Sequence, residues 1–176
     1  ALNFFVFKAY CFSLIFVFSC GSKSISKPDK PYEFDLPMSW GQPFALPENP
    51  VTEKKVELGK YLFYDPIISD DSTVSCSSCH IPEQAFTDGK KLPIGIKGRI
   101  GSRNSPTLVN VGYFPYFLAE GKVPDLETQA LAPGLHDAEM GTEMKKMIER
   151  LRKNKFYKQK FKETFGCDTL DVKHFV

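Results

Sequence analysis

The amino-acid sequence predicts an all-α domain with long irregular loops. Apolar residues recur at helical spacing in several segments, and no segment shows the alternation of apolar and polar residues that is typical of a half-buried strand. Prolines and glycines concentrate in the stretches between these segments. The 176 residues are enough for about one folded domain with a core of its own, which we expect over residues 50–166.

The first predicted helix follows Asn49 and Pro50. Proline is favourable in the first turn of a helix, where its missing N–H leaves no bond unmade. The helix should end at Asp65, because the residue before Pro66 disfavours helical geometry. The segment 81–115 is then rich in glycine and proline and has neither helical nor strand periodicity. We expect a long loop there, and loops of this length are usually functional.

Three more helices are predicted in the second half of the chain. Residues 123–132 form a short helical segment that we expect to end at Pro133. Residues 143–152 carry apolar side chains at helical spacing, including two methionines that we interpret as core residues. The third segment begins at residue 156 and should end at Gly166.

Residues 1–20 have the pattern of an export signal. Lys8 precedes an apolar run of about ten residues, too short to span a membrane as a helix. The run ends in "VFSC", which resembles a bacterial lipoprotein signal in which Cys20 receives lipid and anchors the protein to a membrane. An ordinary secretory signal is the alternative. Both predict a periplasmic or otherwise exported protein, in which the proline-rich residues 21–49 form a tether.

The charge balance excludes one class of partner. The chain has 23 basic and 21 acidic residues, a net charge of +2, and no long basic run. This predicts no binding to nucleic acid.

The most informative motif is "SCSSCH", in which Cys76 and Cys79 precede His80. A redox dithiol would follow a strand in a βαβ unit, and no strand pattern precedes this pair. A structural zinc ion needs four ligands, and the remaining cysteines and histidines are scattered. A c-type haem needs two thiols three residues apart for its thioether bonds and an adjacent histidine for its iron. The sequence therefore predicts covalently bound haem c.

The surrounding motifs resemble the bacterial di-haem cytochrome c peroxidase family, which includes the MauG-type enzymes. The resemblance lies in "LGKYLFYDPIIS", "TVSCSSCH", "FTDG", "GSRNSPTLVN" and "LETQALAPGLHDAEMG", spread over residues 55–170. It implies a cytochrome-c-like domain, the N-terminal and peroxidatic half of a two-haem protein. Residues 167–176 would then start a second haem domain that continues beyond the sequence.

The resemblance also implies roles for individual residues. Glu139 matches the family's distal carboxylate, which moves protons during peroxide cleavage; on its own it would be interpreted as a solvated or capping acid. Asn104 matches a residue that helps to bind calcium between the two domains. Arg103 beside it is either a surface cation or a partner for a haem propionate.

The implied reaction is the reduction of hydrogen peroxide to water with electrons from a cytochrome c or similar carrier. A non-enzymatic electron-transfer cytochrome and a MauG-like oxidase are the alternatives. Family members are commonly dimers, which makes a homodimer one option.

Two motifs depart from the family. The glycine-rich loop "IGIKGRIGSRN" lacks the histidine that blocks the iron in many members, so either the iron stays open or another residue, such as His136, covers it. Ala119 and Glu120 replace the Trp-Asp pair of the family, which puts the usual electron route between the haems in doubt.

Overall fold

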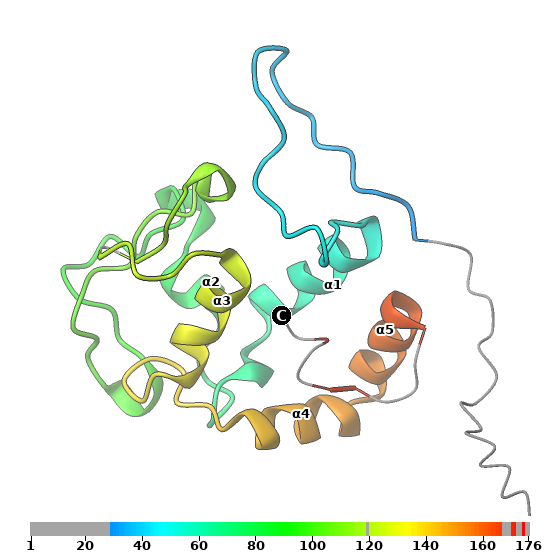
Figure 1. Ribbon diagram of the computed structural model, residues 1–176. Coiled ribbons are helices and arrows are strands. Elements are labelled where there is room, and N and C mark those ends of the chain that lie inside the picture. Colours follow the sequence, from blue (N-terminus) through cyan, green and yellow to red (C-terminus); the bar gives the residue numbers. More distant parts are fainter. Residues whose placement is uncertain (1–28, 119, 167–169, 172–173, 175–176) are drawn as a thin grey trace, which may run out of the picture.

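The structure, a computed structural model, describes residues 29–118, 120–166, 170–171 and 174. These residues form helices joined by irregular chain, and they contain isolated antiparallel bridges but no strand. Figure 1 shows α1, α4 and α5 on one side of the molecule and the long irregular segment with α2 and α3 on the other. The prediction of an all-α fold with long loops is confirmed. The helices are α1 (Glu53–Tyr64), η1 (Pro66–Ile68), α2 (Cys76–Cys79), η2 (Pro82–Gln84), η3 (Ile96–Gly98), η4 (Val111–Tyr113), α3 (Leu126–Leu135), α4 (Met144–Lys153) and α5 (Lys155–Phe165), where η marks a 3-10 helix.

Helix α1 begins at Glu53, so the prediction of a start at Asn49 and Pro50 is wrong. Thr52 caps the helix, and its hydroxyl accepts the N–H of Lys55 at 3.4 Å. The Asn49 side chain makes tertiary contacts instead, because its Oδ1 accepts a hydrogen bond from Lys55 Nζ at 2.7 Å. The helix ends at Asp65 as predicted.

Helix α3 is displaced from its predicted limits at both ends. It starts at Leu126, where the carboxylate of Asp125 accepts the N–H of Thr128 at 2.6 Å. It runs past Pro133, which lies inside the last turn. The carbonyl group of this proline is satisfied from outside the helix, by the N–H of Met140 at 3.3 Å. Because proline has no N–H, one hydrogen bond inside the helix is missing at Pro133, but the helix continues to Leu135.

Helices α4 and α5 form the core with α1. Met147, Ile148 and Leu151 are buried as predicted, and Gly166 ends α5 in the left-handed conformation at φ 68°. Phe161 is buried against the same core. The core cluster consists of Leu58, Ile68, Met140, Met147, Ile148, Leu151, Tyr157, Phe161 and Leu170.

The described part of the predicted tether, residues 29–49, has no helix or strand but contacts the helical domain at Pro31 and at Gly41. Pro31 forms an antiparallel bridge with Thr52. Further along, the hydroxyl of Tyr113 donates to the carbonyl of Gly41 at 2.9 Å. The blue and cyan segment between these contacts extends away from the helices in Figure 1.

Several predictions fall on residues outside the described part of the chain. These are the signal segment with Cys20, residues 21–28 of the tether, the replaced tryptophan position at Ala119, and residues 167–169, 172–173 and 175–176 of the expected second domain. Of the helices that are described, none has the length and apolar character needed to cross a membrane.

Candidate cofactor site

Helix α2 places the two cysteines of the motif on one side of a single helical turn. Ser75 precedes the turn and its N–H donates to the hydroxyl of Ser78 at 3.0 Å. The N–H of His80 closes the turn on the carbonyl of Cys76 at 3.0 Å. Because side chains three residues apart lie on the same helix face, Cys76 and Cys79 point to a common side. This geometry suits two bonds to one flat group.

The imidazole of His80 is held by a backbone carbonyl. Its Nδ1 lies 2.9 Å from the carbonyl oxygen of Phe86. A carbonyl only accepts hydrogen bonds, so Nδ1 carries the proton and Nε2 keeps the lone pair that binds a metal. No sequence pattern points to Phe86 in this role, since the partner is a main-chain atom that every residue possesses.

A tight turn brings the Phe86 carbonyl to the histidine. Ala85 and Phe86 both adopt the left-handed conformation, with φ values of 54° and 57°. Such values are unusual for residues other than glycine and mark a backbone that its surroundings hold in place. One contact that holds it is the hydroxyl of Thr107, which donates to the carbonyl of Ala85 at 2.6 Å. The long loop thus braces the turn that orients His80.

Both cysteines are free thiols with raised pKa values. Burial raises the pKa of Cys76, and burial followed by the nearby charge of Asp88 raises the pKa of Cys79. Redox-active pairs depend on a lowered thiol pKa, so these surroundings do not favour a dithiol catalyst. Zinc is not favoured either, because the described residues contain no group of three or more cysteine, histidine or acidic side chains placed to hold a metal ion.

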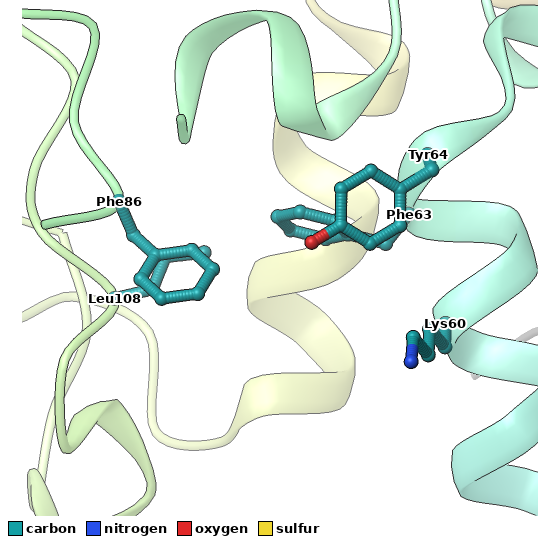
Figure 2. A pocket seen from close by; sticks show the side chains of 5 residues that line it. All are labelled: Lys60, Phe63, Tyr64, Phe86 and Leu108. Atoms are coloured by element: carbon teal, nitrogen blue, oxygen red, sulfur yellow. The ribbon is translucent and has the colours of Figure 1, made fainter. Parts of the chain in front are cut away.

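An apolar pocket of about 190 Å³ lies between α1 and the long loop. In Figure 2, Phe63 and Tyr64 extend from α1 toward Phe86 and Leu108 on the loop side. The rings of Phe63 and Phe86 are 6.4 Å apart between centroids. Phe86 therefore contributes its ring to the pocket and its carbonyl to His80.

Asp88 is a buried acid beside this site. It is 5% exposed, and one of its carboxylate oxygens is buried with no hydrogen-bond partner. The other oxygen accepts the N–H of Lys90 at 3.1 Å. A buried polar atom without a partner is rare in a folded protein and indicates a place where another group or water completes the site. The "FTDG" motif was the only sequence signal for this residue.

Glu139 lies near the cysteine pair, on the turn between α3 and α4. Its charge contributes to the raised pKa of Cys79. Its side chain is 40% exposed, and its Oε1 lies 3.8 Å from Nδ1 of His136. Among the described residues, His136 is therefore the side chain paired with Glu139, and the role of Glu139 as a distal carboxylate stays a prediction.

Two other residues of the predicted site lie on the surface. Arg103 forms an ion pair with Glu120, so its side chain has a protein partner. Asn104 is exposed, and its role in calcium binding stays a prediction.

These residues fit a c-type haem. Two free thiols lie on one turn, and an imidazole held by the Phe86 carbonyl presents its unprotonated Nε2. The ring of the same Phe86 lines an apolar pocket, and the Asp88 carboxylate has an oxygen without a partner. Cys76 and Cys79 would hold the group through thioether bonds, and His80 would ligate its iron.

Comparison with known proteins gives the same assignment. The family model of the di-haem cytochrome c peroxidase matches residues 53–176. The methylamine utilization protein MauG of Methylophilus methylotrophus is 31% identical over 132 residues, which cover 73% of this chain and 39% of that protein. The cytochrome c peroxidase Ccp of Escherichia coli K12 is 35% identical over 117 residues, which cover 66% of this chain and 25% of that protein.

A solved structure extends the likeness to three dimensions. A MauG-like protein associated with microbial copper homeostasis matches with a TM-score of 0.72 and 35% identity, over 77% of this chain and 40% of that one. The chain thus spans between 25% and 40% of the length of these three relatives. From the family model and these likenesses, the chain belongs to the di-haem cytochrome c peroxidase family.

Proposed function

We propose that this chain is the peroxidatic haem domain of a cytochrome c peroxidase. The reaction is the reduction of one hydrogen peroxide by two electrons and two protons to two waters. The electrons come from a reduced cytochrome c or a similar small carrier. The observation that supports the proposal most directly is the match of the di-haem cytochrome c peroxidase family model to residues 53–176, a range that includes Cys76, Cys79, His80 and Glu139.

Each residue of the site has a separate task. Cys76 and Cys79 would attach the haem, and His80, whose Nδ1 is held by the Phe86 carbonyl, would ligate the iron through its Nε2. Bound haem supplies the redox chemistry and an iron position at which peroxide is activated. The Phe63, Phe86 and Leu108 side chains would give the haem an apolar surface to pack on.

Glu139 is the proton-transfer group in this proposal. Its carboxylate accepts a proton from one peroxide oxygen and returns it to the other, which leaves as water. A partly exposed carboxylate suits this exchange because it can trade protons with solvent. His136 lies within 3.8 Å of the same carboxylate and links it to the surface.

A MauG-like oxidase is the second candidate. The relatives in the comparison include both MauG proteins and cytochrome c peroxidases at similar identity. The two candidates differ in the second substrate, which is a redox carrier in one case and another protein or small molecule in the other. Glu139 and the haem motif serve both candidates, so the identity of the second substrate distinguishes them.

The remaining parts of the proposal concern the whole protein. A second haem c would lie in a C-terminal domain. The MauG relative is long enough to contain such a domain, because the match covers only 39% of it. Export, and lipidation at Cys20, would place the protein on the outer side of a bacterial membrane. Labelling cells with a radioactive fatty acid tests the anchor, because Cys20→Ala should abolish the label while leaving haem attachment intact.

The test of the function uses the chain produced with a c-type cytochrome maturation system. A pyridine haemochrome spectrum should show covalent haem c, and the ferric spectrum should change on addition of cyanide. Reduced cytochrome c should be oxidised only when peroxide is present. A low-spin spectrum that is insensitive to both cyanide and peroxide would instead identify an electron-transfer cytochrome.

Glu139→Gln separates the proton-transfer role from haem binding. The amide keeps the size of the side chain but accepts no proton. We expect full haem content and a fall in kcat/KM for peroxide of about 10²-fold or more. Unchanged turnover would remove Glu139 from the mechanism.

A further inference from the structure

A closed loop packs against the turn that carries the proposed proton-transfer group. Residues 93–101 fold back on themselves through two backbone hydrogen bonds. The N–H of Gly95 donates to the carbonyl of Arg99 at 2.8 Å, and the N–H of Gly101 donates to the carbonyl of Pro93 at 2.9 Å. These two hydrogen bonds lie inside the loop, so the loop should keep its shape where it packs against the rest of the protein.

The loop meets its neighbour at Glu139. The N–H of Ile96 donates to the Glu139 carbonyl at 2.8 Å. Gly95 lies so close to the same backbone that a Cβ at this position would be 2.7 Å from the Glu139 Cα and 2.1 Å from the Ala138 carbonyl oxygen. Real Cβ atoms do not approach backbone atoms so closely, so only glycine permits this contact.

Two further contacts fix the same interface. Arg99 Nη1 donates to the carbonyl of Asp137 at 2.8 Å. The Ile96 side chain is 1% exposed, and a Cβ on Gly141 would lie 2.5 Å from its Cδ1. The turn from Asp137 to Gly141 is thus held at its beginning, in its middle at Glu139, and at its end.

We propose that Gly95 is a positioning residue for Glu139, and that the loop 93–101 is a rigid brace that sets where the Glu139 carboxylate stands relative to the haem-binding turn. The inference rests on the proposed function, because it gives Gly95 a purpose only if Glu139 transfers protons. A displacement of about 1 Å at a proton-transfer group is enough to lower a rate by about 10²-fold.

Packing for stability alone is the competing explanation, and it predicts a different pattern. If Gly95 only stabilised the fold, Gly95→Ala would lower the free energy of unfolding, and its effect on cyanide association would be the same with and without the Glu139 carboxylate. If it positions Glu139, the variant should impair the steps that need this carboxylate and spare those that do not. The two effects are separated by testing the loop variants with and without Glu139.

The measurement is the association rate constant of cyanide with the ferric haem-loaded protein, which does not depend on turnover. Hydrogen cyanide must lose its proton to bind, and the Glu139 carboxylate is the acceptor in this proposal. The variants are Gly95→Ala, Arg99→Ala and Glu139→Gln, together with the doubles that combine each loop variant with Glu139→Gln. Gly59→Ala on α1 is the matched control, because a Cβ at Gly59 meets nothing within 4 Å.

We expect Gly95→Ala to slow cyanide association by about tenfold or more, with unchanged haem content. Arg99→Ala introduces no clash and should slow it by about threefold, so it decides the question if Gly95→Ala fails to fold. In the Glu139→Gln background neither loop variant should slow association further, since coupled residues are not additive. Gly59→Ala should match the parent protein.

The outcomes separate the two hypotheses. If Glu139→Gln leaves cyanide association unchanged, the proton-transfer role of Glu139 fails and this inference fails with it. If Glu139→Gln slows association but the loop variants act equally in both backgrounds, or in neither, the proposed function stands and only the positioning role of Gly95 is overturned.

Discussion

The imidazole Nδ1 of His80 and the carbonyl oxygen of Phe86 lie 2.9 Å apart, although a turn of left-handed residues separates them in the chain. The partner of the histidine is a main-chain atom, so the shape of the turn controls it, and the identity of the Phe86 side chain does not. Contacts that hold the turn should therefore matter to the site as much as contacts to the histidine itself.

Thr107→Val tests this dependence. The change removes the hydroxyl that donates to the Ala85 carbonyl at 2.6 Å and keeps the shape of the side chain. We expect a loss of about 0.5–1.5 kcal/mol in the free energy of unfolding, measured by chemical denaturation. Thr128→Val, at an exposed threonine of α3, is the control. An unchanged denaturation midpoint for Thr107→Val would show that the turn holds its shape without this bond.

Single cysteine variants test the attachment of haem. Cys76→Ala and Cys79→Ala should each leave one thioether bond, which shifts the pyridine haemochrome band to longer wavelength. The double variant should lose the haem on a denaturing gel, because no covalent bond remains. Cys167→Ala, outside the motif, should behave as the parent protein. Retention of covalent haem by the double variant would contradict the assignment.

Tyr157→Phe tests a buried link between α5 and the end of α1. The Tyr157 hydroxyl donates to Oδ2 of Asp65 at 2.8 Å, and the tyrosine is 1% exposed. Removing the hydroxyl leaves that oxygen of Asp65 without this donor, so we expect a loss of about 1.5–3 kcal/mol in the free energy of unfolding. Tyr116→Phe, at an exposed position, should cost much less.

The same tyrosine predicts a dependence of stability on alkaline pH. Burial, followed by the Asp65 carboxylate, raises the pKa of Tyr157 well above its usual value. A raised pKa means that the folded state holds the proton longer than the unfolded chain. Its contribution to stability is complete below the unfolded pKa of about 10 and is lost as the pH rises above it. Chemical denaturation at pH 8 and at pH 11 measures the free energy of unfolding at each pH. Between the two, this free energy should fall less in Tyr157→Phe than in the parent protein.

Asp88→Asn tests the buried carboxylate beside Cys79. One of its oxygens is buried without a partner, and the charge is close enough to raise the pKa of that thiol. Asparagine keeps the acceptor for the Lys90 N–H and removes the charge. We expect the haem reduction potential to rise, because a nearby negative charge favours the oxidised iron. Spectroelectrochemistry measures it, with the exposed Asp35→Asn as control, and an unchanged potential would show that the charge is screened.

The parts of the structure that sequence reasoning predicted are those that local rules determine. The spacing of the cysteine pair agrees with the single helical turn on which both thiols lie, and Asp65 before proline ends α1 by a local steric effect. Gly166 ends α5 for a similar reason, since its left-handed conformation suits a residue without a Cβ.

The parts that were missed depend on contacts between distant segments. Asn49 is a good capping residue by type, but its side chain bonds Lys55 and Glu127, and Thr52 becomes the cap. The Phe86 carbonyl has no side-chain signature. Gly95 looked like one of several loop glycines, and only its distance to the Glu139 backbone distinguishes it.

The bridge between Pro31 and Thr52 has a mechanical consequence. The N–H of Tyr32 bonds the Val51 carbonyl at 3.1 Å, and the N–H of Glu53 bonds the Lys30 carbonyl at 2.9 Å. These two bonds close the intervening chain into a slack loop. A pulling force on the chain ahead of residue 29 would therefore pass directly into the start of α1, and the loop with its contact between Gly41 and Tyr113 would bear no tension until the bridge ruptured.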